Sequence, residues 1–243
     1  MPEQLFFTKI LNGLFAGPVT HLLRGLHIEP RYPQAPITNA VSMEVLVVGF
    51  LLVLFIIVRS RLSVESPGGL QHLFEGYHGF IQGQSKEVIG HHGAHFTPFL
   101  AALGLFILIS NLFGIGPGLE APTASSVVPL GCAICAFFYY QAQGFKENGF
   151  GYLKQFLGPV WWLSWLMLPL EIISHIARVM SLTIRLYANM FAGDMVTLVF
   201  FALIPIGIPV VFLGLHIFVA FLQAYVFVLL TVVYLAGAVS EGH

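Results

Sequence analysis

Charged residues are scarce in this sequence. Asp, Glu, Lys and Arg supply 9% of its 243 residues, whereas soluble domains carry about 25%. Hydrophobic residues supply 57%, which excludes an ordinary soluble chain and indicates a polytopic membrane protein. The formal net charge of −1 leaves no basic bias of the kind that nucleic-acid binding requires, so partners have to be sought through the membrane segments.

Cysteine is nearly as rare. The two cysteines, Cys132 and Cys135, form a CxxC motif within the apolar run SSVVPLGCAICAFFYY. No second pair and no alternation of strands and helices accompanies them, as a redox or zinc motif would require. We therefore interpret both as helix-packing residues.

The first forty residues lack the basic stretch that begins a cleaved signal peptide. Their apolar run, LFFTKILNGLFAG, contains Lys9, which favours an interfacial helix or a docking segment. Pro30, Pro33 and Pro36 then predict an extended linker. We expect residues 1–40 to form this N-terminal segment and residues 41–243 to form a membrane domain.

The membrane domain is predicted to be all-α, with about five membrane helices and one amphipathic surface helix. Residues 41–58 are long enough to span a ~30 Å hydrocarbon core and end at Arg59 and Arg61. The later segments are an amphipathic helix at 70–90, a membrane hairpin at 95–143 and a second hairpin at 159–239.

The second hairpin stands out by its length. Its first half, at about 159–204, is about twice as long as an upright span at ~1.5 Å per residue, even if Pro169 breaks it. We expect its two helices to be long and strongly tilted. Lys and Arg are absent from the turns near 114–126 and 205–209. This pattern places the N-terminus outside and the C-terminus inside.

Polar side chains share one face of the stretch EIISHIARVMSLTIRLYANMFAGD. At ~100° per residue, most of them fall within about 40° of Glu171. They are His175, Arg178, Arg185 and Asn189, with Ser174 at the edge. Asp194 falls about 140° away, so it joins this face only if the helix bends.

Arg185 is the least expected residue of this face. A charge at mid-bilayer costs ~2.5–3.5 kcal/mol, and no acid lies three or four positions from Arg185. Its counter-ion is therefore predicted to come from elsewhere. Glu171, His175 and Arg178 are also compatible with a purely structural ion-pair network near a membrane surface.

The final helix carries a second, sparser polar stripe. His216, Gln223 and Tyr234 lie within about 20° of one another in LHIFVAFLQAYVFVLLTVVYL. Each is compatible with ordinary hydrogen-bonded packing. If this stripe faces Arg185, it becomes a candidate for positioning the arginine or carrying protons, because His titrates near neutral pH and Gln both donates and accepts hydrogen bonds.

Two other patterns are weaker. His91, His92 and His95 lack a fourth ligand, so a solvated loop is favoured over a metal site. GIGPG is neither preceded by a strand nor followed by Lys-Ser or Lys-Thr, so it does not predict a phosphate-binding loop. We expect the chain to bind no nucleotide, metal or other cofactor, and to catalyse no reaction by itself.

The runs MSLTIRLYANMFAGD and LHIFVAFLQAYVFVLLTVVYL closely resemble the two signature helices of subunit a of F-type ATP synthases. FILISNLFGIGPG and TASSVVPL are similar to the first membrane hairpin of that family. The resemblance implies a stator subunit beside a rotating ring of c subunits, with peripheral-stalk b subunits as further partners. It also implies two offset half-channels that carry protons, in an energy-transducing membrane such as the bacterial inner membrane.

The resemblance assigns roles to individual residues. Arg185 matches the essential arginine that faces the ring carboxylates, and at an effective dielectric of ~20 and ~4 Å the attraction between the two charges is ~4 kcal/mol. The implied proton path comprises Asn189 and Gln223 beside it, Asp194 and His216 towards the outside, Glu171, His175 and Ser174 towards the inside, and Asn111 in the first hairpin.

Two rival interpretations stay open. A stand-alone proton-coupled secondary transporter would also carry intramembrane Glu, His and Arg, although no inverted repeat is visible. A non-transporting scaffold would use the polar face only for packing. The sequence also leaves open the choice between H⁺ and Na⁺, the size of the ring, the direction of operation, and a bacterial or organellar origin.

Overall fold

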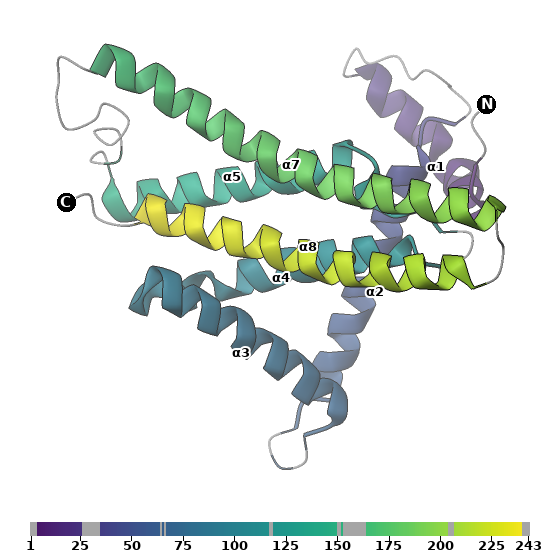
Figure 1. The fold of residues 1–243 in the computed structure, drawn as a ribbon, viewed down its shortest axis with the longest axis horizontal. Coiled ribbons are helices and arrows are strands. Elements are labelled where there is room, and N and C mark those ends of the chain that lie inside the picture. The colour runs from purple at the N-terminus through teal and green to yellow at the C-terminus, as the bar shows by residue number, and fades with distance from the viewer. Residues whose placement is uncertain are drawn as a thin grey trace.

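The structure, a computed structural model, describes residues 4–25, 35–63, 65, 67–116, 119–149, 152, 164–203 and 207–239. Its regular elements are helices, and no strand occurs among these residues. The helices are α1 (Phe6–Gly25), α2 (Asn39–Ser60), α3 (Gly69–Ile89), η1 (His91–Phe96), α4 (Thr97–Phe113), η2 (Pro122–Ala124), α5 (Val127–Asn148), α7 (Ser164–Leu203) and α8 (Ile208–Val239) (Figure 1). The prediction of an all-α polytopic membrane protein is confirmed.

Four described segments are long and apolar enough to cross a membrane. They are Asn39–Ser60, His92–Phe113, Ser164–Leu203 and Pro209–Val239. The remaining long helix of the first hairpin, α5, ends in the polar sequence QAQGFKEN and is not among the four. Its place as a fifth membrane helix therefore stays a prediction.

The last two helices are long and pack as a hairpin, as predicted. The 40 residues of α7 and the 32 residues of α8 correspond to ~60 Å and ~48 Å. Pro169 lies inside α7 and does not end it. Because the hydrocarbon core is ~30 Å thick, neither helix can stand upright within it. In Figure 1, α7 and α8 run side by side in front of α4 and α5, and α2 crosses behind them at a steep angle.

The N-terminal segment contains a helix, α1, which is hydrogen-bonded to the residues directly before α2. Asn12 Nδ2 donates to the Ile37 carbonyl at 3.0 Å, and the Ile37 amide donates to Asn12 Oδ1 at 3.1 Å. Of the predicted linker, Pro30 and Pro33 lie outside the described residues. The interfacial position of α1 stays a prediction.

The histidine-rich segment after α3 is not the loop that the sequence predicts. It forms the short 3₁₀ helix η1, because Gly93 packs directly on α3: a Cβ atom at Gly93 would lie 2.4 Å from the Ser85 carbonyl oxygen. His92 and His95 are exposed. No group of three or more potential metal ligands occurs in the described part of the chain.

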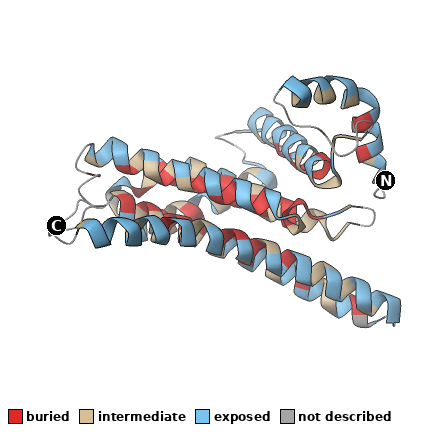
Figure 2. Cartoon of the chain, turned by 90° about the horizontal axis from the view of Figure 1, so that it is seen from above, coloured by how far each residue is buried: buried red, intermediate tan, exposed pale blue. Residues whose placement is uncertain are grey.

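The core lies where α4, α5, α7 and α8 face one another, and their outward surfaces are exposed (Figure 2). Small residues allow close contact there, since Ala133, Ala136 and Ala220 are almost completely buried. Close approach of this kind is the main source of helix association in lipid, where apolar burial alone gains little. These small residues therefore allow α5 and α8 to pack closely within the bundle.

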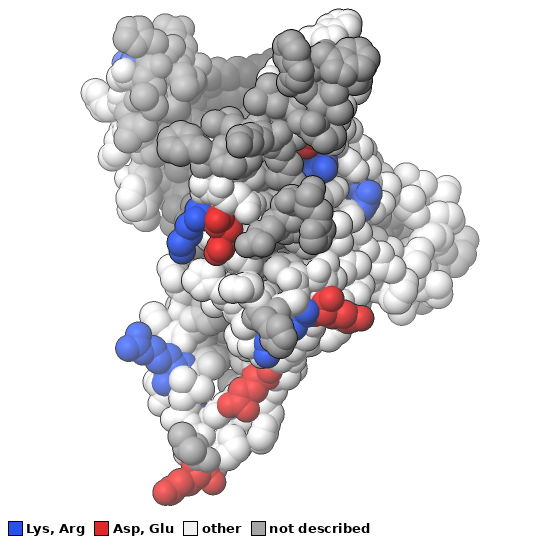
Figure 3. Space-filling model, turned by 90° about the vertical axis from the view of Figure 1, so that its left-hand side faces the viewer, with Lys and Arg blue, Asp and Glu red and all other residues white. Residues whose placement is uncertain are grey.

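Charged side chains are few and mixed in sign on the end of the molecule that Figure 3 presents. Among the described residues on this face, Lys or Arg and Asp or Glu appear singly or in adjacent pairs.

Candidate functional site

Arg185 lies near the middle of α7 and is half-buried. Its Nη2 atom donates a hydrogen bond to Ser181 Oγ, one turn earlier, at 3.4 Å. Within the described ranges, no carboxylate forms an ion pair with Arg185. The guanidinium group therefore has no ion-pair partner there, although the helix around it is apolar.

One turn further along α7, Asn189 joins α7 to α8. Its Nδ2 atom donates a hydrogen bond to Gln223 Oε1 at 2.8 Å, and Gln223 is only 2% exposed. The polar stripe of the final helix thus faces α7, as its sequence pattern allows. The third member of that stripe, Tyr234, lies beneath Arg178, whose guanidinium carbon is 5.2 Å from the centre of the ring, within range of a cation–π interaction.

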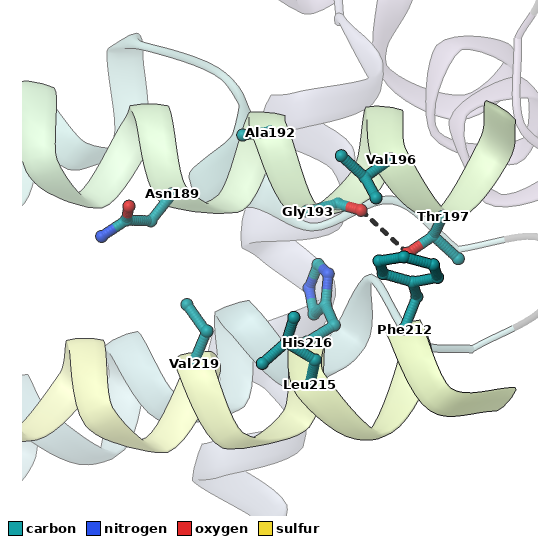
Figure 4. A pocket seen from close by; sticks show the side chains of 9 residues that line it. All are labelled: Asn189, Ala192, Gly193, Val196, Thr197, Phe212, Leu215, His216 and Val219. Atoms are coloured by element: carbon teal, nitrogen blue, oxygen red, sulfur yellow. Dashed lines mark hydrogen bonds between the residues drawn. The ribbon is translucent and has the colours of Figure 1, made fainter. Parts of the chain in front are cut away.

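Beyond Asn189, α7 and α8 line a partly open cavity of about 290 Å³. Asn189, Gly193 and Thr197 contribute to its wall from α7, and Phe212, His216 and Val219 contribute from α8. In Figure 4 the imidazole of His216 points from α8 towards the backbone of α7 at Gly193. We call this space the outer cavity.

Asp194 joins the outer cavity through His216. Its Oδ1 atom lies 3.8 Å from His216 Nε2, and the His216 side chain is buried. The Asp194 carboxylate thus lies beside a buried residue of α8. The acid is brought into the site by a residue of the neighbouring helix, which a single-helix wheel does not include.

Gly193 is a site residue that sequence reasoning missed. A Cβ atom there would lie 2.6 Å from His216 Nδ1, so only glycine allows the ring to approach α7 this closely. The Gly193 carbonyl also accepts a hydrogen bond from Thr197 Oγ1 at 2.8 Å. Its only sequence signal is its place directly before Asp194.

At the other end of the polar face, Glu171 and His175 form a second cluster. Glu171 Oε1 lies 3.4 Å from His175 Nε2, and Tyr140 of α5 places its hydroxyl 3.0 Å from His175 Nδ1. Both residues line a small cavity of about 70 Å³ together with Tyr140, Tyr152 and Arg178, which is enough space for water. We call this space the inner chamber.

Tyr152 closes the inner chamber from the segment after α5. It is buried, and its hydroxyl donates a hydrogen bond to Gln141 Oε1. Burial raises the pKa of this hydroxyl, while the positive charge of Arg178 opposes the rise. Tyr152 therefore acts as a neutral donor at the wall of the chamber.

Two predicted site residues lie elsewhere. Asn111 is fully buried, donates from Nδ2 to the Ala220 carbonyl at 3.2 Å, and accepts at Oδ1 from Thr123 Oγ1 at 2.7 Å. These bonds tie α4 to α8 and η2, so Asn111 lies at a helix contact. Ser174 is half-exposed on α7 and lines neither the outer cavity nor the inner chamber.

Comparisons with known proteins point in one direction. The family model described as ATP synthase A chain matches residues 41–236. The chain is similar to ATP synthase subunit a of Koribacter versatilis (strain Ellin345), with 55% identity over 244 residues and 100% of both chains covered. It is 54% identical to ATP synthase subunit a of Solibacter usitatus (strain Ellin6076), over 87% of this chain and 91% of that one. It is 39% identical to ATP synthase subunit a of Geotalea uraniireducens (strain Rf4), over 89% of this chain and 94% of that one.

Proposed function

The chain belongs to the ATP synthase A chain family, and from this premise we propose a path by which protons reach and leave a rotating ring. As a member of this family it is the proton-translocating stator subunit of the membrane sector, and a multi-pass membrane protein. A stand-alone secondary transporter is not favoured, because the family relationship extends over the whole chain.

Arg185 faces the carboxylates of the c subunits in this proposal. The observation that carries it is a half-buried guanidinium, in a membrane helix, without an ion-pair partner among the described residues. An intramembrane charge of this kind requires a counter-ion, and a ring carboxylate supplies one. A passing carboxylic acid gives up its proton there, since ~4 kcal/mol of attraction favours its ionised form at an effective dielectric of ~20 and ~4 Å.

The two cavities serve as half-channels on either side of Arg185. The outer cavity, with Asp194 and His216, delivers protons to the ring past Asn189 and Gln223. The inner chamber, with Glu171 and His175, receives them on the inside. The fixed charge of Arg185 between them repels a proton that would pass directly. Each proton therefore crosses the membrane bound to a ring carboxylate as the ring turns. The membrane potential supplies ~2.3 kcal/mol for each proton per 100 mV.

The partners follow from this arrangement. They are the ring of c subunits, the b subunits of the peripheral stalk, the lipid bilayer, and protons as the transported ion. We place the chain in the bacterial inner membrane with the N-terminus outside. The placement of basic residues supports this orientation, since Arg59 and Arg61 follow the apolar part of α2 and Lys146 lies in the last turn of α5.

The test is Arg185→Ala in the complete complex, reconstituted into liposomes. We expect ATP-driven proton pumping and ATP synthesis to be lost, while ATP hydrolysis by the detached soluble sector persists, because the variant loses the charge that deprotonates the ring. Arg59→Ala, which removes a cation at the end of α2, is the matched control and should pump normally. Normal pumping by Arg185→Ala would refute the proposal.

A further inference from the structure

Tyr140 is a buried hydroxyl that the proposed path does not use. Its side chain is 2% exposed, and its hydroxyl lies 3.0 Å from Nδ1 of His175, which is 7% exposed. Phe137 packs edge-on against the His175 ring, with 5.8 Å between the two ring centroids and 75° between the ring planes. The imidazole is thus held by two residues of α5, on a helix that the sequence pattern does not connect with Glu171.

The surroundings indicate the direction of this hydrogen bond. Arg178 offers only donors, and its side chain hydrogen-bonds to the Tyr140 hydroxyl oxygen. The O–H of Tyr140 therefore points to His175 Nδ1. A neutral imidazole that accepts at Nδ1 carries its proton on Nε2. That nitrogen lies 3.4 Å from Glu171 Oε1.

We propose that Tyr140 is a positioning residue of the inner half-channel, which fixes the His175 ring and its tautomer so that Nε2–H stabilises the unprotonated Glu171 carboxylate. This inference rests on the proposed function of the inner chamber. A proton that arrives from the ring binds a Glu171 oxygen and later leaves from that oxygen to water on the inside. His175 keeps its own proton throughout and only orients the acceptor.

Other titratable or charged groups also lie near this hydrogen bond. Among the described residues, Arg178 on α7 and Tyr152 after α5 line the chamber with Glu171, Tyr140 and His175, and Tyr234 on α8 lies against Arg178. Without the Tyr140 hydroxyl, the ring has a second tautomer that presents an acceptor lone pair to Glu171. That tautomer favours the protonated carboxyl, so release to the inside becomes slower.

The experiment compares Tyr140→Phe with Tyr139→Phe in the complete complex, reconstituted for ATP synthesis with controlled pH on each side. Tyr139 lies one position away, and its ring stacks on Phe99 at a centroid distance of 3.7 Å, so this control loses the same atom outside the chamber. We expect Tyr140→Phe to lower synthesis at neutral inside pH by roughly three- to tenfold. The inside pH at which the variant reaches half of its maximal rate should rise by up to about one unit, so that an alkaline inside pH restores synthesis.

One further variant separates the possible failures. Glu171→Gln tests the chamber itself: normal synthesis by this variant would refute the proposed inner half-channel, whatever Tyr140 does. If Glu171→Gln is inactive but Tyr140→Phe has the same pH profile as Tyr139→Phe, the half-channel stands and the positioning role of Tyr140 is refuted.

Discussion

At the scale of single residues, Gly193 controls the outer cavity most directly. The ring of His216 occupies the space where any other residue would place its Cβ atom, 2.6 Å from Nδ1. His216 is the end of a side chain and not backbone, so a larger residue would displace the ring without unfolding the helices. The cost should therefore appear in proton delivery more than in stability.

Gly193→Ala tests this point. We expect proton flux through the complex to fall roughly tenfold or more, because a displacement of about 1 Å at a reacting group has large effects on rate. Assembly and thermal stability should change little. Gly214→Ala is the control on α8, since a Cβ atom there has no neighbour within 4 Å. Equal flux in the two variants would contradict the role of Gly193.

The site residues differ in how far the sequence could predict them. Arg185 is predictable because one helix suffices: it is a cation in an apolar stretch without an acid one turn away. Asp194 could be paired with His216 only through the family resemblance, since this contact is made with another helix. Tyr140 gives no signal at all, because a tyrosine in an apolar helix is common and its partner lies on α7.

At the scale of helices, α5 and α8 pack closely at one end because Gly144 has no side chain. A Cβ atom at Gly144 would lie 2.7 Å from the Tyr152 ring and 3.1 Å from the Ala238 carbonyl oxygen. Asn148 Nδ2 donates to the same carbonyl at 3.0 Å. Because that oxygen belongs to the backbone of α8, it cannot move without the helix.

We therefore expect Gly144→Ala to lower the stability of the subunit by about 1–3 kcal/mol through overpacking. Gly131→Ala, an exposed glycine of the same helix with no neighbour within 4 Å of the added atom, should be neutral or stabilising by up to ~1 kcal/mol. The measurement is the apparent melting temperature of the purified complex in detergent. A stabilised Gly144→Ala variant would show that the helices adjust freely.

The helices themselves were largely predictable. Long apolar runs and the length of the last hairpin depend only on hydropathy and on the rise per residue, and both agree with α2, α7 and α8. The 3₁₀ helix at His91–Phe96 was not predictable, because it depends on the contact of Gly93 with α3. A tertiary contact there decides the local structure of a polar, glycine-containing segment.

At the scale of the whole molecule, the orientation in the membrane can be tested with cysteines. In a variant with Cys132 and Cys135 replaced by Ala, Ser60→Cys should react with a membrane-impermeant thiol reagent only from the inside, and Leu203→Cys only from the outside. Both positions are exposed at helix ends. Labelling of both from the same side would refute the proposed orientation of α2 and α7.

The slope of α7 has a mechanical consequence. On the proposed path, Glu171 and Asp194 are ~35 Å apart along the helix, which exceeds the ~30 Å depth of the hydrocarbon core. Because α7 is too long to stand upright, we expect part of this separation to run in the membrane plane, beside the proposed ring. Protons would then bind and leave the ring at different angular positions, so the tilt of α7 is expected to set the direction of rotation for a given gradient. A reversed gradient should turn the rotor the other way without any change in the stator.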